Sequence, residues 1–253
     1  MLLGRDDVNP NKHNEDGQTP LICAALNGHE GVVKILLGRD DVDAGKPDYY
    51  CRTPLWWAVS TGHEGMAKIL LGRGDVSPNK PNKDGRTPLI CAALNGNEGM
   101  VKMLLGRDGV NASKPDHCYR TPLWWAALSG HEGVVEILLG REDVSPDKSD
   151  GDGQTPLSSA AFNGYEGVVK ILLERDDVNP DEPNNDGLTP LCYAACGGRE
   201  GVVKILLGRD DVDRNKLDNS GRTPLWWATN YGYTGVISLL QSPNSPPTTR
   251  PKP

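Results

Sequence analysis

The sequence has few apolar residues and no long apolar run. Hydrophobic residues make up 37% of its 253 residues, which is below the usual share of a globular chain. Its longest apolar stretches are interrupted by lysine, as in VVKILL from Val32 to Leu37, whereas a membrane-spanning helix needs roughly 18 or more apolar residues. No charged segment followed by an apolar one opens the chain. The sequence therefore predicts neither a membrane span nor a secretory signal.

Positive charge is also scarce. The chain has 27 Lys and Arg against 34 Asp and Glu, a formal net charge of −7 and a pI near 5.3. Binding to nucleic acid or to an anionic membrane needs a basic field, so this balance disfavours both. A neutral or basic polypeptide is the partner that the charge favours.

Sequence motifs for catalysis and for metal or cofactor binding are missing. No Ser or Cys is singled out beside a His and a carboxylate, no Gly-rich phosphate loop follows a strand, and no Walker sequence occurs. The stretch from Asp177 to Asp181 matches the start of a calcium loop, but Glu182 and Leu188 stand where that loop needs Gly and Glu. We therefore expect no enzyme activity, no metal and no cofactor.

The six cysteines do not form a disulfide pattern, because this is not a short secreted chain. Cys192 and Cys196 are four residues apart and lack a matching second pair, so they are interpreted as buried small residues and not as metal ligands. Cys23 and Cys91 occupy the same position in two copies of the sequence TPLICAALNG. These copies belong to repeats that are two apart in the chain, which puts the two cysteines too far from each other for a disulfide. We expect a reduced, cytosolic compartment.

Glycine and proline are abundant, with 30 and 20 residues, and both recur periodically. The dipeptide Thr-Pro occurs seven times at a constant spacing of 34 residues, which indicates a repeat architecture. The threonines are Thr19, Thr53, Thr87, Thr121, Thr155, Thr189 and Thr223.

Each copy predicts two short helices and a loop. Thr is a good N-cap and Pro suits the first helical position, so TPLICAALNG from Thr19 predicts a helix that stops at Gly28. A second helix is expected over His29–Leu37, followed by a projecting loop rich in Asp, Asn, Pro and Gly.

These residues resemble the ankyrin repeat, whose T-P-L-H-x-A signature is here TPLICA, TPLWWA, TPLSSA and TPLCYA. The resemblance implies an all-α solenoid of seven stacked helix-turn-helix units with projecting loop or hairpin fingers. Two departures are a period of 34 instead of 33 and the absence of His after TPL. In its period and in the sequence motif RDDVNP, the chain also resembles the repeat arrays of large fungal multidomain proteins. Those proteins are similar to animal and plant intracellular immune receptors.

The period divides the chain into a partial repeat, seven repeats and a tail. Residues 1–13 read as the end of a repeat whose beginning is absent, and residues 241–253 as a Pro-rich, disordered tail. The repeats between them are 14–47, 48–81, 82–115, 116–149, 150–183, 184–217 and 218–240.

The positions that vary between repeats are the loop tips and the inner helix face. In ankyrin repeat proteins these positions line the concave groove that binds partners, and here aromatic residues cluster at them in the second, fourth and seventh repeats. Aromatic residues and Arg are enriched at interface hot spots. The predicted partner-binding residues are Tyr49, Tyr50, Arg52, Trp56, Trp57, His117, Tyr119, Arg120, Trp124, Trp125, Phe162, Tyr193, Arg222, Trp226, Trp227 and Tyr231.

All six tryptophans lie in three copies of RTPLWW. Counting 100° per residue from Leu55 puts the second Trp of each pair on the groove-side stripe of its helix. In ankyrin repeats an apolar residue at this position wedges between neighbouring repeats, so the resemblance implies core packing for Trp57, Trp125 and Trp227. The first Trp replaces the family's His. We expect Trp56, Trp124 and Trp226 to be exposed for partner contact, with the preceding Arg as a cation–π neighbour.

The sequence thus predicts a monomeric, non-catalytic protein-interaction module that binds a protein or extended peptide in a concave groove. Two alternatives stay open. The array is either a structural or regulatory arm that docks on other domains of a larger parent protein, or an engineered, consensus-like scaffold.

Overall fold

The computed structural model describes residues 9–242, which contain only helices and the loops between them. Most of the predicted partial repeat (1–13) and of the Pro-rich tail (241–253) lies outside this range. The helices are α1 (Pro20–Leu26), α2 (Glu30–Leu37), α3 (Pro54–Ser60), α4 (Glu64–Leu71), α5 (Pro88–Leu94), α6 (Glu98–Leu105), α7 (Pro122–Ser129), α8 (Glu132–Leu139), α9 (Pro156–Asn163), α10 (Glu166–Leu173), α11 (Pro190–Cys196), α12 (Glu200–Leu207), α13 (Pro224–Tyr231) and α14 (Thr234–Gln241).

The first helix of every pair begins at the Thr-Pro dipeptide. Thr19 is extended and its side chain accepts a hydrogen bond from the backbone N–H of Ile22, while Pro20 occupies the first helical position, where no N–H is needed. The other six first helices start in the same way. These helices are short because a glycine with positive φ follows closely, such as Gly28 at 72°.

The second helices are amphipathic and most start with Glu, whose charge suits the positive end of the helix dipole. In α2, Val33 and Leu36 are buried, whereas Lys34 is exposed. Alanines such as Ala24 and Ala25 on the first helices are buried too, which lets neighbouring helices approach closely. The core therefore lies between the two helices of each pair and between adjacent pairs.

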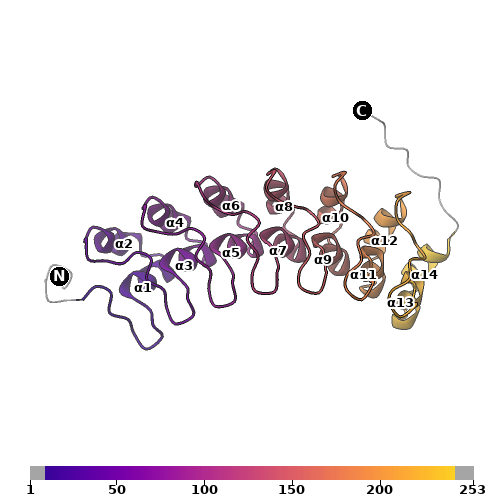
Figure 1. The fold of residues 1–253 in the computed structure, drawn as a ribbon, viewed down its shortest axis with the longest axis horizontal. Coiled ribbons are helices and arrows are strands. Elements are labelled where there is room, and N and C mark those ends of the chain that lie inside the picture. Colours follow the sequence, from indigo (N-terminus) through magenta and orange to yellow (C-terminus); the bar gives the residue numbers. More distant parts are fainter. Residues whose placement is uncertain (1–8, 243–253) are drawn as a thin grey trace. The chain divides into compact units, whose positions relative to one another are not determined.

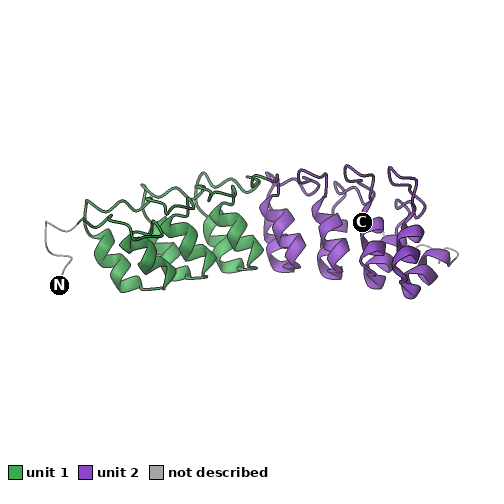
Figure 2. Cartoon of the chain, turned by 90° about the horizontal axis from the view of Figure 1, so that it is seen from below, with its two compact units in different colours: residues 1–117 green, residues 118–253 purple. Residues whose placement is uncertain are grey.

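The chain divides into two compact units, residues 1–117 and 118–253 (Figure 2). In the first unit α1, α3 and α5 pack in one layer, and α2, α4 and α6 in a second layer (Figure 1). In the second unit α7, α9, α11 and α13 form one layer, and α8, α10, α12 and α14 the other. For the described residues this confirms the predicted all-α fold of helix-turn-helix pairs.

We call the loop between a second helix and the next Thr-Pro a finger. An Asp or Asn five residues before the Thr shapes its tip: Asp48 Oδ1 accepts the backbone N–H groups of Tyr50 and Arg52, both at 2.9 Å. Adjacent tips are joined by backbone bonds, such as Lys83 N–H to the carbonyl of Tyr50 at 2.9 Å. Each finger is thus fixed by its own turn and by its neighbour.

Candidate protein-binding surface

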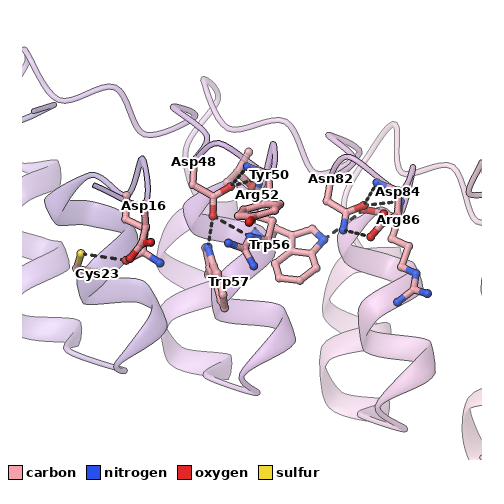
Figure 3. Close-up of polar contacts among 12 residues, drawn as sticks. Asp16, Cys23, Asp48, Tyr50, Arg52, Trp56, Trp57, Asn82, Asp84 and Arg86 are labelled. Atoms are coloured by element: carbon pink, nitrogen blue, oxygen red, sulfur yellow. Dashed lines mark hydrogen bonds and ion pairs between the residues drawn. The ribbon is translucent and has the colours of Figure 1, made fainter. Parts of the chain in front are cut away.

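A buried carboxylate organises the finger of the second repeat (Figure 3). Besides its two backbone bonds, Asp48 accepts the Arg52 Nε–H at 2.8 Å and the Trp57 Nε1–H at 3.1 Å, both on Oδ2. The Asp48 side chain has no exposed area, and that of Arg52 is 21% exposed. A buried carboxylate is tolerated only when its hydrogen bonds are satisfied, and here four donors satisfy it.

The Arg52 guanidinium lies against aromatic rings as well as against Asp48. Its Cζ is 4.2 Å from the ring centroid of Trp57 and 4.6 Å from that of Tyr50. Arginine stacks well on aromatic faces because its planar charge is weakly hydrated. The predicted cation–π neighbours are therefore present, and the closest tryptophan is the second of the pair.

The seventh repeat contains the same cluster in the second unit. Asp218 Oδ2 accepts Arg222 Nε–H at 2.8 Å and Trp227 Nε1–H at 3.1 Å, and Arg222 Cζ is 4.2 Å from the Trp227 ring. Burial alone would raise the pKa of the Asp218 carboxyl, but the hydrogen bonds that it accepts from Arg222, Ser220 and Trp227 together outweigh burial and lower that pKa. The carboxylate is held in its charged form.

The finger tip of the second repeat exposes two tyrosines. Tyr49 is 53% and Tyr50 57% exposed, although both are large side chains. Tyr49 lies over Gly17 of the preceding finger, and its hydroxyl is 3.2 Å from His13 Nδ1. Tyr50 lies between Arg52 and Lys83, whose Nζ is 5.5 Å from its ring centroid. Both rings are oriented by the finger yet open to solvent.

Two fingers have a residue other than glycine in a left-handed conformation. In every repeat the residue two positions before the Thr of Thr-Pro has a positive φ. Five repeats have Gly at this turn position: Gly17, Gly85, Gly153, Gly187 and Gly221. The second repeat has Cys51 with φ 60°, and the fourth has Tyr119 with φ 63°. A side chain there costs about 1 kcal/mol or more. The two strained fingers are the ones that carry exposed tyrosines.

The side chain at this turn position is matched by the tip of the next finger. Where the turn residue is Gly153, the next tip places Asn185 against it. Where the turn residue is Tyr119, the next tip has Gly151, and the Tyr119 ring lies over it. Tyr119 itself is 62% exposed. In these two pairs of neighbouring fingers, a side chain on one finger therefore lies against a glycine on the other.

The first tryptophan of each pair is not uniformly exposed, which corrects the prediction made for it. Trp124 is only 4% exposed and Trp56 is half-buried, whereas Trp226 is 43% exposed. The reason is a bond to the following repeat: Trp56 Nε1–H donates to the carbonyl of Arg86 at 3.3 Å, and Trp124 Nε1–H to that of Gln154 at 3.0 Å. The first tryptophan is the one that reaches the next repeat.

The second tryptophan packs on its own finger instead. Trp125 is 6% exposed, in agreement with core packing, but Trp57 and Trp227 are half-buried, so the prediction was only partly right. Their indole N–H groups reach Asp48 and Asp218 in the same repeat. Each pair is nearly perpendicular, with ring centroids 5.0–5.4 Å apart.

The remaining predicted residues differ in exposure. Phe162 is 43% and Tyr231 54% exposed, His117 is exposed, and Arg120 is half-buried over Trp125 at 4.3 Å. Tyr193 is half-buried, accepts a hydrogen bond from Asn184 Nδ2 at 3.0 Å, and contacts Phe162 edge to face. Burial raises the pKa of Tyr193 to about 12. Its hydroxyl therefore stays protonated over the physiological range.

Two kinds of residue in this surface were not predicted. Asp48 and Asp218 were missed, although a signal was present: each copy of RTPLWW follows an Asp by four residues, at Asp48, Asp116 and Asp218. The strain at Cys51 was also missed. Its signal is the replacement of a Gly that most other repeats have at that position.

The described range holds no helix that is long and apolar enough to cross a membrane. Within the same range, no three His, Cys, Asp or Glu side chains gather in a way that could hold a metal ion.

Comparison with known families agrees with the geometry of capped helix pairs and fingers. A family model for ankyrin repeats (3 copies) matches residues 1–80, 41–116, 74–150, 108–182 and 174–250, which together span almost the whole chain. The chain therefore belongs to the ankyrin repeat family, and its fold is an ankyrin repeat fold. No curated protein matched the chain. Neither comparison supports the narrower resemblance to fungal multidomain proteins.

Proposed function

We propose that this chain is a non-catalytic module that binds a protein or an extended peptide along its fingers and first helices. Ankyrin repeats are in general protein–protein interaction modules. The aromatic residues of the fingers support binding of the partner on this surface, in the concave groove that the family resemblance implies.

The observation that carries the proposal is the exposure of Tyr49 and Tyr50 on a finger fixed by Asp48. Interface hot spots are enriched in tyrosine, tryptophan and arginine. A side chain that is already oriented loses less conformational entropy on binding. Tyr49 is held by Gly17 and His13, and Tyr50 by Arg52, so a partner would meet two large rings that are already placed.

The backbone strain at Cys51 and Tyr119 supports the same proposal. An unfavourable conformation that costs stability is often found at functional sites. Glycine would relieve it at both positions, as it does in the other fingers. The side chains there, and the tyrosines beside Cys51, are therefore candidates for contact with the partner.

The charge of the chain suggests the kind of partner. With a net charge of −7, the chain would favour a neutral to basic polypeptide over nucleic acid or an anionic membrane. No disulfide joins the cysteines of the described residues, which fits the reducing cytoplasm. We further propose that the chain acts as a monomer.

A displayed peptide library provides a test without a known partner. Peptides selected on the full chain should lose about 2 kcal/mol of binding, or roughly 30-fold in affinity, when Tyr49 or Tyr50 is changed to Ala. Tyr165→Ala is the matched control, because Tyr165 is 37% exposed but is the residue that directly precedes α10, away from the finger tips.

The expected result is a loss of affinity for the finger variants alone. If selected peptides bound Tyr49→Ala, Tyr50→Ala and the wild type equally, while Tyr165→Ala or another second-helix variant weakened them, the fingers would not be the binding surface. Thermal melts of each variant would confirm that the fold is kept.

A further inference from the structure

Trp226 differs from the other two tryptophans at the same repeat position. Trp56 and Trp124 each donate Nε1–H to a carbonyl of the following repeat. Trp226 is 43% exposed, and no residue in the range 9–242 accepts a hydrogen bond from its indole. A bare indole N–H on an apolar ring is a donor available for another chain segment.

Trp226 is one end of a row of four aromatic rings on the seventh repeat. Trp226 and Trp227 have centroids 5.0 Å apart, Trp227 stacks on Tyr231 at 6.1 Å, and Tyr231 lies 6.1 Å from Tyr233. Tyr231 is 54% and Tyr233 38% exposed, and Leu217 on the adjoining finger is 58% exposed. We call Trp226, Trp227, Tyr231 and Tyr233 the aromatic row.

This chemistry suits a proline-rich segment. Such segments adopt the polyproline II helix, whose rings pack between aromatic side chains and whose carbonyls are free to accept hydrogen bonds from donors such as an indole N–H. From Trp226 to Tyr231 the row covers five residues of helix, about 7.5 Å, which two or three residues of polyproline II would span.

The chain itself carries a segment of this kind, residues 243–253, with the sequence PNSPPTTRPKP. Five of its eleven residues are proline, and it contains Arg250 and Lys252 but no acidic residue. The chain as a whole has a net charge of −7, so attraction between this basic segment and the acidic repeats is expected.

The place where this segment leaves the repeats favours contact with the aromatic row. Helices α13 and α14 form an antiparallel pair, so Ser242, after the end of α14, lies at the same end of the pair as Trp226 in the first turn of α13. The Ser242 carbonyl accepts a hydrogen bond from Arg214 Nη1 at 2.8 Å, which holds this exit point. Pro246 is four residues further on, a reach of about 12 Å in a polyproline II segment.

We propose that residues 243–253 bind back onto the aromatic row of the seventh repeat as a polyproline II segment, with a backbone carbonyl accepting the Trp226 Nε1–H. The segment then replaces the contact that a following repeat makes with Trp56 and Trp124. This inference is independent of the partner proposed above, because it requires only residues of this chain.

The test follows the six indole N–H resonances of the full chain by nuclear magnetic resonance, each assigned with a Trp→Phe variant. A full-length variant with Pro243→Ala, Pro246→Ala and Pro247→Ala should shift the Trp226 indole resonance and leave those of Trp56 and Trp57 unmoved. The matched control, Thr248→Ala with Thr249→Ala, keeps every proline and should leave Trp226 unmoved.

A synthetic PNSPPTTRPKP peptide added to the proline variant should return the Trp226 resonance saturably toward its wild-type position. Three outcomes would overturn the proposal: an unchanged Trp226 resonance in the proline variant, equal shifts of all six indoles, or a wild-type Trp226 position that depends on protein concentration. The last result would mean that a second copy of the chain covers the row.

Discussion

Asp48 Oδ2 accepts a hydrogen bond from Trp57 Nε1 at 3.1 Å, across nine residues of sequence and with no exposed area on the carboxylate. The same oxygen accepts Arg52 Nε–H, so one buried charge joins the finger to the first helix. This bond makes the second tryptophan of RTPLWW part of its own finger and leaves the first to contact the next repeat.

Changing Asp48 to Asn should destabilise the chain by about 2 kcal/mol. The amide can keep the turn, as Asn82 does by accepting backbone N–H groups on Oδ1, but it removes the charge that faces Arg52 and Trp57. Breaking a buried pair costs about 3–5 kcal/mol, and the partial exposure of Arg52 reduces this. Urea-induced unfolding measures the change.

The matched control is Asp150→Asn. Asp150 Oδ1 accepts the backbone N–H groups of Asp152 and Gln154, but within residues 9–242 no Arg or Trp side chain donates a hydrogen bond to it. Its substitution should change the free energy of unfolding by less than about 0.5 kcal/mol. Equal losses for Asp48→Asn and Asp150→Asn would show that the turn, and not the ion pair, stabilises the finger.

Trp124→Ala should cost about 3–5 kcal/mol of unfolding free energy, because it leaves a cavity beside a buried Trp125 and removes the bond to Gln154. Trp226→Ala should cost about 1 kcal/mol, since this ring is 43% exposed and its indole N–H has no partner among the described residues. Chemical denaturation of the two variants measures both losses of unfolding free energy. A larger loss for Trp226 would contradict the assigned role of the first tryptophan.

Asp181 should make stability depend on pH in the direction opposite to that of an ion-paired carboxylate. Its Oδ1 is buried without a hydrogen bond, and burial raises the pKa of its carboxyl. The backbone N–H of Asp213, which donates to Oδ2, and the charge of Lys216 oppose this rise, and the carboxylates of Asp213 and Asp211 add to it. The folded state therefore binds the proton more tightly than the unfolded chain. The stabilising contribution is complete below about pH 3.9, the unfolded pKa, and is lost as pH rises through the raised folded pKa.

Asp181→Asn removes this dependence. At the equivalent positions Asn11 and Asn79, the Nδ2–H donates to a carbonyl thirty residues further on, at 2.6 Å in each case. The variant should therefore unfold at a higher temperature than the wild type at pH 7, with the difference shrinking toward pH 4. The reverse change, Asn79→Asp, should destabilise the chain at pH 7. A difference in unfolding temperature between Asp181→Asn and the wild type that did not change with pH would contradict a raised pKa of Asp181 in the folded state.

Gly65 and Gly31 should respond differently to alanine. A Cβ at Gly65 would meet the carboxylate of Glu30 from the preceding repeat, whereas a Cβ at Gly31 would meet nothing. Alanine in place of glycine stabilises a helix by up to about 1 kcal/mol, less near its end. Gly31→Ala should show this gain, and Gly65→Ala should show little of it because Glu30 must move. Thermal melts of a Glu30→Ala, Gly65→Ala double variant should recover the gain.

Cys51→Gly should raise the free energy of unfolding by about 1 kcal/mol, because glycine relieves the positive φ of 60°. Cys51→Ala is the control, since alanine removes the thiol and keeps the strain. If both substitutions had the same effect, the side chain and not the backbone would determine stability at this turn.

The sequence by itself determined the architecture. The 34-residue Thr-Pro period, the N-cap threonine and the apolar spacing of EGVVKILL are local signals, and each acts within one repeat. That is why a helix begins at Pro20, directly after the predicted cap Thr19, and the second helix begins at Glu30, one residue after the predicted start at His29. The same reasoning found the aromatic clusters, because seven copies in one chain can be compared position by position.

Only the tertiary structure decided which aromatic residues are free to bind. Trp56, Trp124 and Trp226 have the same local sequence, yet their exposure differs because it depends on what the following repeat offers to the indole N–H. The burial of Asp48 likewise depends on how the finger folds over the first helix. A helical wheel gives the direction of a side chain within one repeat, whereas burial is a property of two repeats in contact.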